Sequence, residues 1–362
     1  MERPGNRPGR GEFIVVEVSE TQDIFGRNIM KITAGLGSVD EYVRYVRAGA
    51  DELFCGYVPY EWNRKYGTIL PLNRREVLGV NVQIGSESEL RILAALVRKY
   101  GRPVHLTFNS LYYIPKQYPE IADIICRCRE LGFSSFIIAD PALLVYIKEH
   151  GIRCELHLSG ETAEVNSRML KVFEGLDICR LIFHRKNSFA DMESVIRQER
   201  KQEGCGIREF EAFVLNELCQ FSGAFCNSLH CDELGHLCRV PYKLGQIKKE
   251  IGGNRSDINC RECSSNDEEQ KYDPEGYLCG ATGCGLCALY QLQKAGITHL
   301  KLVGRGNYAD FMEKDINNLR IAREILENTD TEAEYLHEMK QRLFPHGCSG
   351  LCYYLSRENA RF

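Results

Sequence analysis

Short apolar segments alternate with amphipathic segments along most of the chain. Between residues 31 and 305, the apolar segments have the length of β-strands and the segments between them have helical periodicity. This alternation predicts β–α units that build a parallel sheet. The expected strands are residues 31–36, 52–55, 104–108, 135–139, 153–157, 180–183, 209–214 and 299–303.

The segments between these strands predict helices, and several of them begin at good capping residues. Ser86 is followed by Glu89, and Ser188 by Asp191, as in a capping box. Eight strands that alternate with helices predict an α/β fold, a closed (β/α)8 barrel of the TIM type, whose active groups lie at the carboxyl ends of the strands. The expected helices are residues 40–48, 87–99, 121–131, 143–149, 166–173 and 189–198.

The alternation breaks between the seventh and eighth strands, where a cysteine-rich insertion is expected. This insertion is part of the barrel domain, and a helix over residues 308–328 is expected to pack back on the barrel. We therefore divide the chain into a flexible N-terminal segment (1–28), a barrel (29–326) that includes the cysteine-rich region (215–290), and a helical C-terminal tail (327–362).

Composition indicates a globular protein without a membrane span. Of 362 residues, 44% are hydrophobic and 27% charged, and the net charge of -4 neither indicates nor excludes nucleic acid as a partner. No apolar run reaches the length of a transmembrane helix, and residues 1–11 are polar. We therefore expect a cytoplasmic protein, in which the 17 cysteines indicate metal or redox chemistry rather than disulfides.

Nine cysteines fall within one stretch of the second half of the chain. Four thiolates suit either tetrahedral zinc or an iron–sulfur cluster. Spacing alone leaves both metals open, because two Cys-x2-Cys pairs here would also fit a zinc ribbon. The nine are Cys219, Cys226, Cys231, Cys238, Cys260, Cys263, Cys279, Cys284 and Cys287.

Polar side chains at the predicted strand ends are the candidates for substrate contacts and catalysis. His184, Glu161 and His157 could move protons. Arg185 and Arg305 could clamp a carboxylate or phosphate through their fork-shaped donors, with Asn109 and Ser159 as further substrate-binding groups. A structural role competes with each assignment: Asp140 before Pro141 also reads as a helix cap, and His157 as a hydrogen-bonded core residue.

Several motifs resemble those of the peptidase U32 (collagenase-like) family. The most specific are Glu211-Ala-Phe213 followed by Cys219, six residues and Cys226, then Cys238-Arg-Val-Pro-Tyr, and Lys301-Leu-Val-Gly-Arg305 near the eighth strand. Shorter similarities extend over residues 31–326. Departures from the family pattern, including Leu215-Asn216, Ala224, Val303 and Glu161, identify a divergent member.

The resemblance implies a 4Fe-4S cluster, because family members known as hydroxylation proteins hold one with four cysteines. The pattern maps onto Cys219, Cys226, Cys238 and a fourth ligand that is either Cys284 or Cys287. Zinc remains the alternative metal. Further cysteines, Cys231, Cys260, Cys263, Cys279, Cys348 and Cys352, leave room for a second metal centre.

The resemblance favours redox chemistry, such as an oxygen-independent hydroxylation of a small molecule or an RNA. A peptidase is the alternative that the family name carries, but common peptidase motifs such as His-Glu-x-x-His and Gly-x-Ser-x-Gly are absent from the sequence. A non-catalytic iron–sulfur or zinc subunit is the third hypothesis, since some relatives work with a related partner subunit.

Overall fold

A computed structural model describes residues 26–67, 70–74, 82–201, 206–219, 226 and 271–354. In this part of the chain, eight parallel strands form a closed barrel, with β9 pairing to β1. All eight predicted strands are confirmed, with ends that shift by no more than two residues. Around the barrel the strands are β1 (Lys31–Gly35), β2 (Glu52–Tyr57), β4 (Val104–Phe108), β5 (Ser135–Ile138), β6 (Glu155–Leu158), β7 (Ile178–Ile182), β8 (Glu209–Leu215) and β9 (His299–Leu302).

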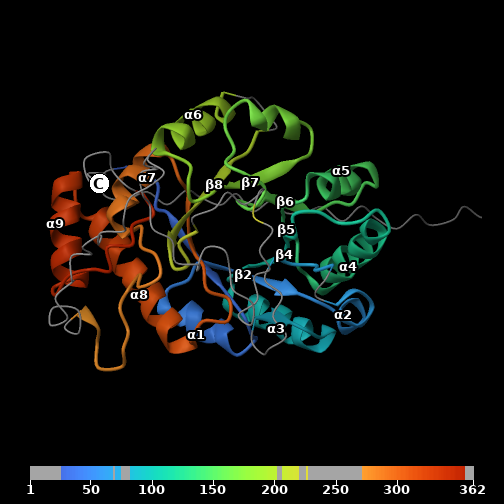
Figure 1. Ribbon diagram of the computed structural model, residues 1–362, viewed down its shortest axis with the longest axis horizontal. Coiled ribbons are helices and arrows are strands. Elements are labelled where there is room, and N and C mark those ends of the chain that lie inside the picture. Colours follow the sequence, from blue (N-terminus) through green and yellow to red (C-terminus); the bar gives the residue numbers. More distant parts are fainter. Residues whose placement is uncertain are drawn as a thin grey trace, which may run out of the picture.

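Helices surround the barrel, as the view in Figure 1 shows. This arrangement confirms the predicted (β/α)8 class. A short extra strand, β3 (Gln83–Ile84), pairs with the end of β2. The helices are α1 (Glu41–Ala48), α2 (Tyr60–Tyr66), α3 (Glu87–Tyr100), α4 (Gln117–Leu131), α5 (Pro141–Glu149), α6 (Phe189–Glu199), α7 (Leu289–Ala295), α8 (Ala309–Glu327) and α9 (Glu332–Leu343).

Local sequence signals fix several helix starts. Ser86 and Ser188 both form the predicted capping boxes, in which the serine accepts from the third residue's backbone N–H and the acidic side chain accepts in return. Asp140 accepts from the backbone N–H of Ala142, so it caps α5. The helix expected over residues 166–173 is instead the short 3-10 helix η1 (Met169–Phe173); Asn166 Oδ1 accepts from the N–H groups of Arg168 and Met169 before it, and Gly175 after it has a positive φ of 79°.

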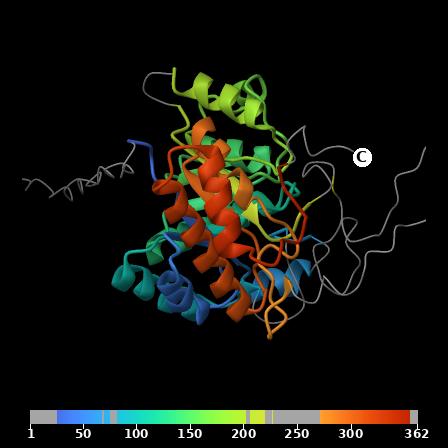
Figure 2. The same cartoon turned by 90° about the vertical axis from the view of Figure 1, so that its left-hand side faces the viewer.

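The C-terminal part of the chain packs on one side of the barrel. Figure 2 shows α8 and α9, in orange and red, side by side in front of the strands. The hydroxyl of Tyr335 in α9 donates to the carbonyl of Leu286 in the 3-10 helix η5 (Leu286–Ala288). The predicted helical tail is therefore α9. None of the helices in the described residues is long and apolar enough to cross a membrane.

Successive residues of each strand point to opposite sides of the barrel wall, and the two sides differ in chemistry. The outward side chains are apolar and buried against the helices; Ile32, Leu53, Leu106 and Leu300 are examples with no exposed surface. The inward side chains include many charged groups. Barrel interiors are usually filled by Val, Ile and Leu, so a polar interior points to a special role there.

Candidate functional site

A cavity opens at the carboxyl ends of the strands, where barrel enzymes place their active sites. It collects side chains from almost every strand end, and most of its polar groups are charged. Five residues that we predicted as site residues line it together. The lining consists of Phe54, Arg74, Thr107, Asn109, Ile137, Ser159, Glu161, Ile182, Arg185, Phe213, Glu217, Lys301, Val303, Gly304 and Arg305.

Arg185 is a buried cation of this cavity. It follows β7, is only 7% exposed, and its guanidinium lies 3.9 Å from the ring centroid of Phe213. Its Nε is buried and has no hydrogen-bond partner among the described residues. Burial by itself would lower the pKa of Arg185, but Tyr353, Glu161 and Cys219 raise it, so the side chain stays charged. Arg185 therefore offers an unused charge-assisted donor.

Arg305 crosses the mouth from the loop after β9. Its Nη1 donates to Thr107 Oγ1 on β4 at 3.2 Å, so the side chain passes over β1 and β2. Two glycines make this path available: a Cβ on Gly56 would lie 2.6 Å from Nη1, and one on Gly35 would lie 3.2 Å from Cγ. The glycines are required here for close approach rather than for flexibility.

Glu161 is an acidic group that lies between Arg74 and Arg185. Its Oε2 lies 3.5 Å from Nε of Arg74, and its Oε1 lies 3.7 Å from Nη1 of Arg185. Ser159 and Asn109 support this arrangement: Ser159 Oγ accepts from the backbone N–H of Glu161, and Asn109 Oδ1 accepts from the backbone N–H of Arg74. Both predicted substrate-binding groups thus also have a local structural role.

The floor of the cavity is an apolar layer inside the barrel. Phe54, Ile137, Ile182 and Phe213 form a cluster of their own, separate from the core under the helices. Lys301 projects into this layer, with Nζ 3.8 Å from the ring centroid of Phe54. Sequence reasoning did not assign Lys301 or Arg74 a role. The signal for Lys301 was a lysine between two leucines of a short strand.

Lys301 is paired with a carboxylate below the floor. Its Nζ donates to Glu211 Oε1 at 2.5 Å. Burial lowers the pKa of Lys301, and Glu211 only partly offsets this effect. Burial also acts to raise the pKa of Glu211, but Lys301 and Arg180 outweigh it and hold the value at about 2. The pair is therefore a fixed ion pair at the base of the cavity.

Below the floor, Arg180 is the centre of a buried ion network. Its Nη1 lies 2.8 Å from Glu52 Oε2 and 3.0 Å from Glu211 Oε2, and its Nη2 lies 2.7 Å from Glu209 Oε2. His105 Nε2 lies 2.9 Å from the same Glu52. Burial alone would raise the pKa of Glu52, but Arg180 and the adjacent imidazoles more than offset it, so the pKa lies well below its usual value.

The two histidines proposed as proton carriers do not line the cavity. His157 lies in the buried ionic layer, with its ring centroid 4.6 Å from that of His105. Burial, with Arg180 as the next cause, lowers the pKa of His157 well below its usual value, so it is neutral there. His184 precedes Arg185 in the turn after β7. Neither histidine is among the lining residues that include Glu161 and Arg185.

His184 nevertheless lies close behind the cavity wall. It is buried, its Nδ1 accepts from the backbone N–H of Lys186 at 3.3 Å, and its Nε2 has no partner among the described residues. Burial lowers its pKa, and Glu161 offsets this only in part. A role for His184 as a proton carrier stays a prediction.

The predicted metal ligands are described only in part. Cys219 follows β8, and its segment lies beside that of Cys284, because Asn216 N–H donates to the Gly283 carbonyl and Leu218 N–H to the Thr282 carbonyl. Cys226 is buried. Cys238 lies outside the described residues. Within the described ranges, no three His, Cys, Asp or Glu side chains form a group that could hold a metal ion.

Thiolates are the ligands that iron–sulfur clusters use, but the described residues supply no complete ligand set. The two candidates for the fourth ligand differ in exposure: Cys284 is buried, whereas Cys287 is exposed. The backbone of Cys284 forms an antiparallel β-bridge with Leu215 at the end of β8. The backbone of Cys284 also forms an isolated parallel β-bridge with the backbone of Cys352 in the C-terminal segment. Of the cysteines considered for a second metal centre, Cys231, Cys260 and Cys263 lie outside the described residues.

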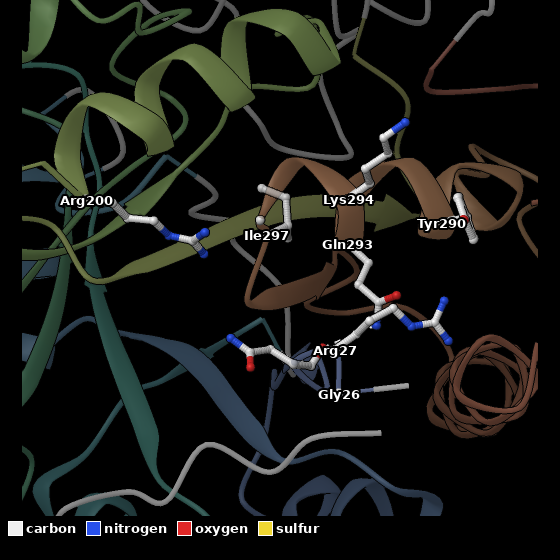
Figure 3. Close-up of a pocket in the computed structure, with 9 residues that line it drawn as sticks. Gly26, Arg27, Arg200, Tyr290, Gln293, Lys294 and Ile297 are labelled. Carbon is white, nitrogen blue, oxygen red and sulfur yellow. Dashed lines mark hydrogen bonds between the residues drawn. The ribbon is translucent and has the colours of Figure 1, made fainter. Parts of the chain in front are cut away.

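A second hollow lies at the opposite end of the barrel and is shown in Figure 3. It has a volume of about 490 Å³. Arg27 and Arg200 approach it from either side, and α7 contributes Gln293 and Lys294. These residues precede strands or end helices, so this is the amino-terminal face of the barrel, where residues usually serve stability.

Comparisons with known proteins agree with the motifs. The model of Peptidase family U32 matches residues 37–361. The curated tRNA hydroxylation protein P of Escherichia coli (strain K12) is 26% identical over 221 residues, which are 59% of this chain and 44% of that protein. The chain therefore spans less than half the length of this relative.

Solved structures overlap with the chain only weakly. A U32 peptidase has 12% identity and a TM-score of 0.38, covering 51% of this chain and 68% of its own. Dihydrodipicolinate synthase from Bacillus clausii has 10% identity and a TM-score of 0.42, covering 88% and 80%. Scores this low assign no function. The family model, in contrast, covers most of the chain, so this protein belongs to Peptidase family U32.

Proposed function

We propose that this chain is an enzyme that hydroxylates a base of an RNA substrate at the mouth of its barrel. The observation that carries the proposal is the cavity at the strand ends, where Arg185 and Arg305 are both buried. Buried guanidinium groups suit the recognition of phosphate. The description of the Escherichia coli relative as a tRNA hydroxylation protein supports RNA over other phosphate-bearing substrates.

The cavity residues divide into binding groups, a proton carrier and a floor. Arg185 and Arg305 would hold a phosphate or carboxylate oxygen. Glu161 lies between Arg74 and Arg185 and is the one predicted proton carrier that lines the cavity. The apolar floor excludes water, which strengthens each of these electrostatic contacts.

We further propose that the cysteine-rich connection after β8 holds an iron–sulfur cluster. Cys219, Cys226 and Cys238, with Cys284 or Cys287, would be its ligands. When bound, such a cluster supplies electron transfer near the strand ends. Zinc bound by the same cysteines would give this site only a structural role.

Anaerobic purification followed by iron, sulfide and zinc analysis tests this part of the proposal. We expect iron and sulfide with broad visible absorbance. The same analysis of Cys284→Ser and Cys287→Ser identifies the fourth ligand as the residue whose loss removes iron. Zinc in place of iron would refute the redox function and favour a non-catalytic partner subunit.

Peptidase activity has less support from the cavity. A peptidase requires an activated nucleophile and an oxyanion stabiliser. Ser159 lines the cavity, but its Oγ accepts from the N–H of Glu161, and no His or Cys is among the described lining residues. We therefore expect that metal-replete protein does not cleave casein. Cleavage of casein by the wild type that is lost in Ser159→Ala would support peptidase activity instead.

A further inference from the structure

Exposed aromatic side chains gather on the same face as the cavity. Among the described residues, the exposed large aromatics are four tyrosines, and each lies in a connection that leaves the carboxyl end of a strand. Tyr60, Tyr112 and Tyr308 are 71%, 68% and 80% exposed, and Tyr272 is 46% exposed. Of the exposed aliphatic side chains, Ile92, Val145 and Val172 lie in α3, α5 and η1, while Leu351 lies beside Cys284 near the end of β8.

Three of these tyrosines lie on neighbouring parts of the rim. Tyr60 begins α2 after β2, Tyr112 lies between β4 and α4, and Tyr308 precedes α8 after β9. Since β9, β1, β2 and β4 are consecutive in the barrel, their connections are adjacent. A contact joins two of these connections: Lys116, in the same connection as Tyr112, has its Nζ 5.7 Å from the ring centroid of Tyr66, which lies in α2 with Tyr60.

The connection that carries Tyr308 also reaches this part of the rim. Arg305, three residues before it, donates to Thr107 on β4. The arginine thus extends from the Tyr308 connection across the cavity toward the Tyr112 connection. A strand of nucleic acid that contacts the tyrosines would therefore pass the buried cations of the cavity.

The tyrosines are presented by anchored backbone. Next to Tyr112, the buried Tyr113 donates its N–H to Asp140 at 3.0 Å and its hydroxyl to the carbonyl of Leu72 at 2.7 Å. The ring of Tyr308 packs edge-on against Phe311, with centroids 5.9 Å apart. A ring held on a fixed segment loses little conformational entropy when a ligand binds.

We propose that Tyr60, Tyr112 and Tyr308 are stacking platforms for unpaired bases of a single-stranded RNA segment that enters the mouth of the barrel. This inference rests on the proposed function, which it deepens by naming how the RNA is held. Isolated exposed rings around a cationic cavity match the way proteins bind single strands, where each base stacks on one aromatic ring. A protein partner would more often need a contiguous apolar patch, and the described residues of these three connections expose no large aliphatic side chain.

Fluorescence anisotropy with a labelled single-stranded RNA and, separately, a labelled RNA duplex tests the inference on the full-length protein. Each Tyr→Ala change should weaken single-strand binding by roughly tenfold, whereas Tyr→Phe should retain it because the ring remains. Ile92→Ala and Val145→Ala are matched controls, since both remove exposed apolar side chains from the outer helices. Circular dichroism verifies that each variant is folded.

The outcomes separate this inference from the proposed function. Wild-type protein that binds RNA, together with Tyr→Ala variants that bind equally well, overturns the stacking role alone. Variants that lose duplex and single-strand binding to the same extent also overturn it, because duplex bases are not free to stack. Wild-type protein that binds no RNA overturns both proposals.

Discussion

Arg180 should be the most important single charge for the stability of the barrel. Arg180→Met keeps much of the aliphatic stem but removes the guanidinium that lies 2.8 Å from Glu52 and 3.0 Å from Glu211. Both carboxylates are buried, at 5% and 0% exposure. Breaking a buried ion pair costs about 3 to 5 kcal/mol when the remaining charge stays buried without a partner. Here Glu211 keeps Lys301 and Glu52 keeps His105, so we expect a loss near the lower end of that range, still a large share of the roughly 5 to 15 kcal/mol that stabilises a natural domain.

Arg44 provides a matched control with the same chemistry at the surface. Its guanidinium lies 2.5 Å from Asp310 and 2.7 Å from Glu313, but its side chain is 42% exposed. Exposed pairs contribute about 0 to 1 kcal/mol. Urea unfolding followed by circular dichroism measures Arg180→Met and Arg44→Met against wild type. Equal losses in the two variants would refute the reasoning.

The pH dependence provides a second test of the same network. With its pKa held at about 2 in the folded state, Glu211 stabilises the protein above its ordinary pKa of 4.5, and this stabilisation is lost as the pH falls toward 2. Without Arg180 the pKa of Glu211 should rise, although Lys301 still lowers it, so Glu211 is protonated at a higher pH in the folded variant than in the wild type. The stability deficit of Arg180→Met should therefore shrink as the pH falls through the raised pKa of Glu211 toward 2; a constant deficit would contradict this.

Two further predictions concern the cluster and the cavity. Cys226→Ser should lose iron and sulfide, while Cys154→Ser, before β6 at the other end of the barrel, should retain both; equal metal content would contradict the ligand assignment. Gly56→Ala should displace both Gln83 and Arg305 and weaken RNA binding, because the added Cβ would clash with Gln83 Oε1 and lie 2.6 Å from Arg305 Nη1. Gly85→Ala, whose Cβ would meet nothing closer than 3.9 Å, is the control, and equal RNA affinities measured by anisotropy would count against the Arg305 path.

The fold was largely predictable because its strands carry a strong local signal. In β4, for example, outward Leu106 and Phe108 alternate with inward His105 and Thr107, and the outward residues pack under the helices. Capping boxes at Ser86 and Ser188 marked helix starts in the same way. These signals depend on near neighbours in the sequence, so they need no knowledge of the tertiary structure.

The site was predictable only in part, because side-chain direction at a strand end depends on register. The strand-end rule correctly brought Arg185, Arg305 and Glu161 to one cavity, but it could not tell that His184 is not among the lining residues. The ionic layer around Arg180 was missed, since its members come from strands far apart in the sequence. Spacing could not place the cysteines either, because it does not fix the path of a long connection.

The central claim is that the barrel mouth modifies RNA, and nucleoside analysis tests it most directly. Transfer RNA is isolated from a host that lacks its own hydroxylation protein and expresses either wild-type protein or Arg185→Ala at equal levels. Digestion and mass spectrometry should find, with wild type only, a nucleoside heavier by one oxygen atom. A nucleoside profile identical to that of the host without the protein, or the same product with Arg185→Ala, would contradict the claim.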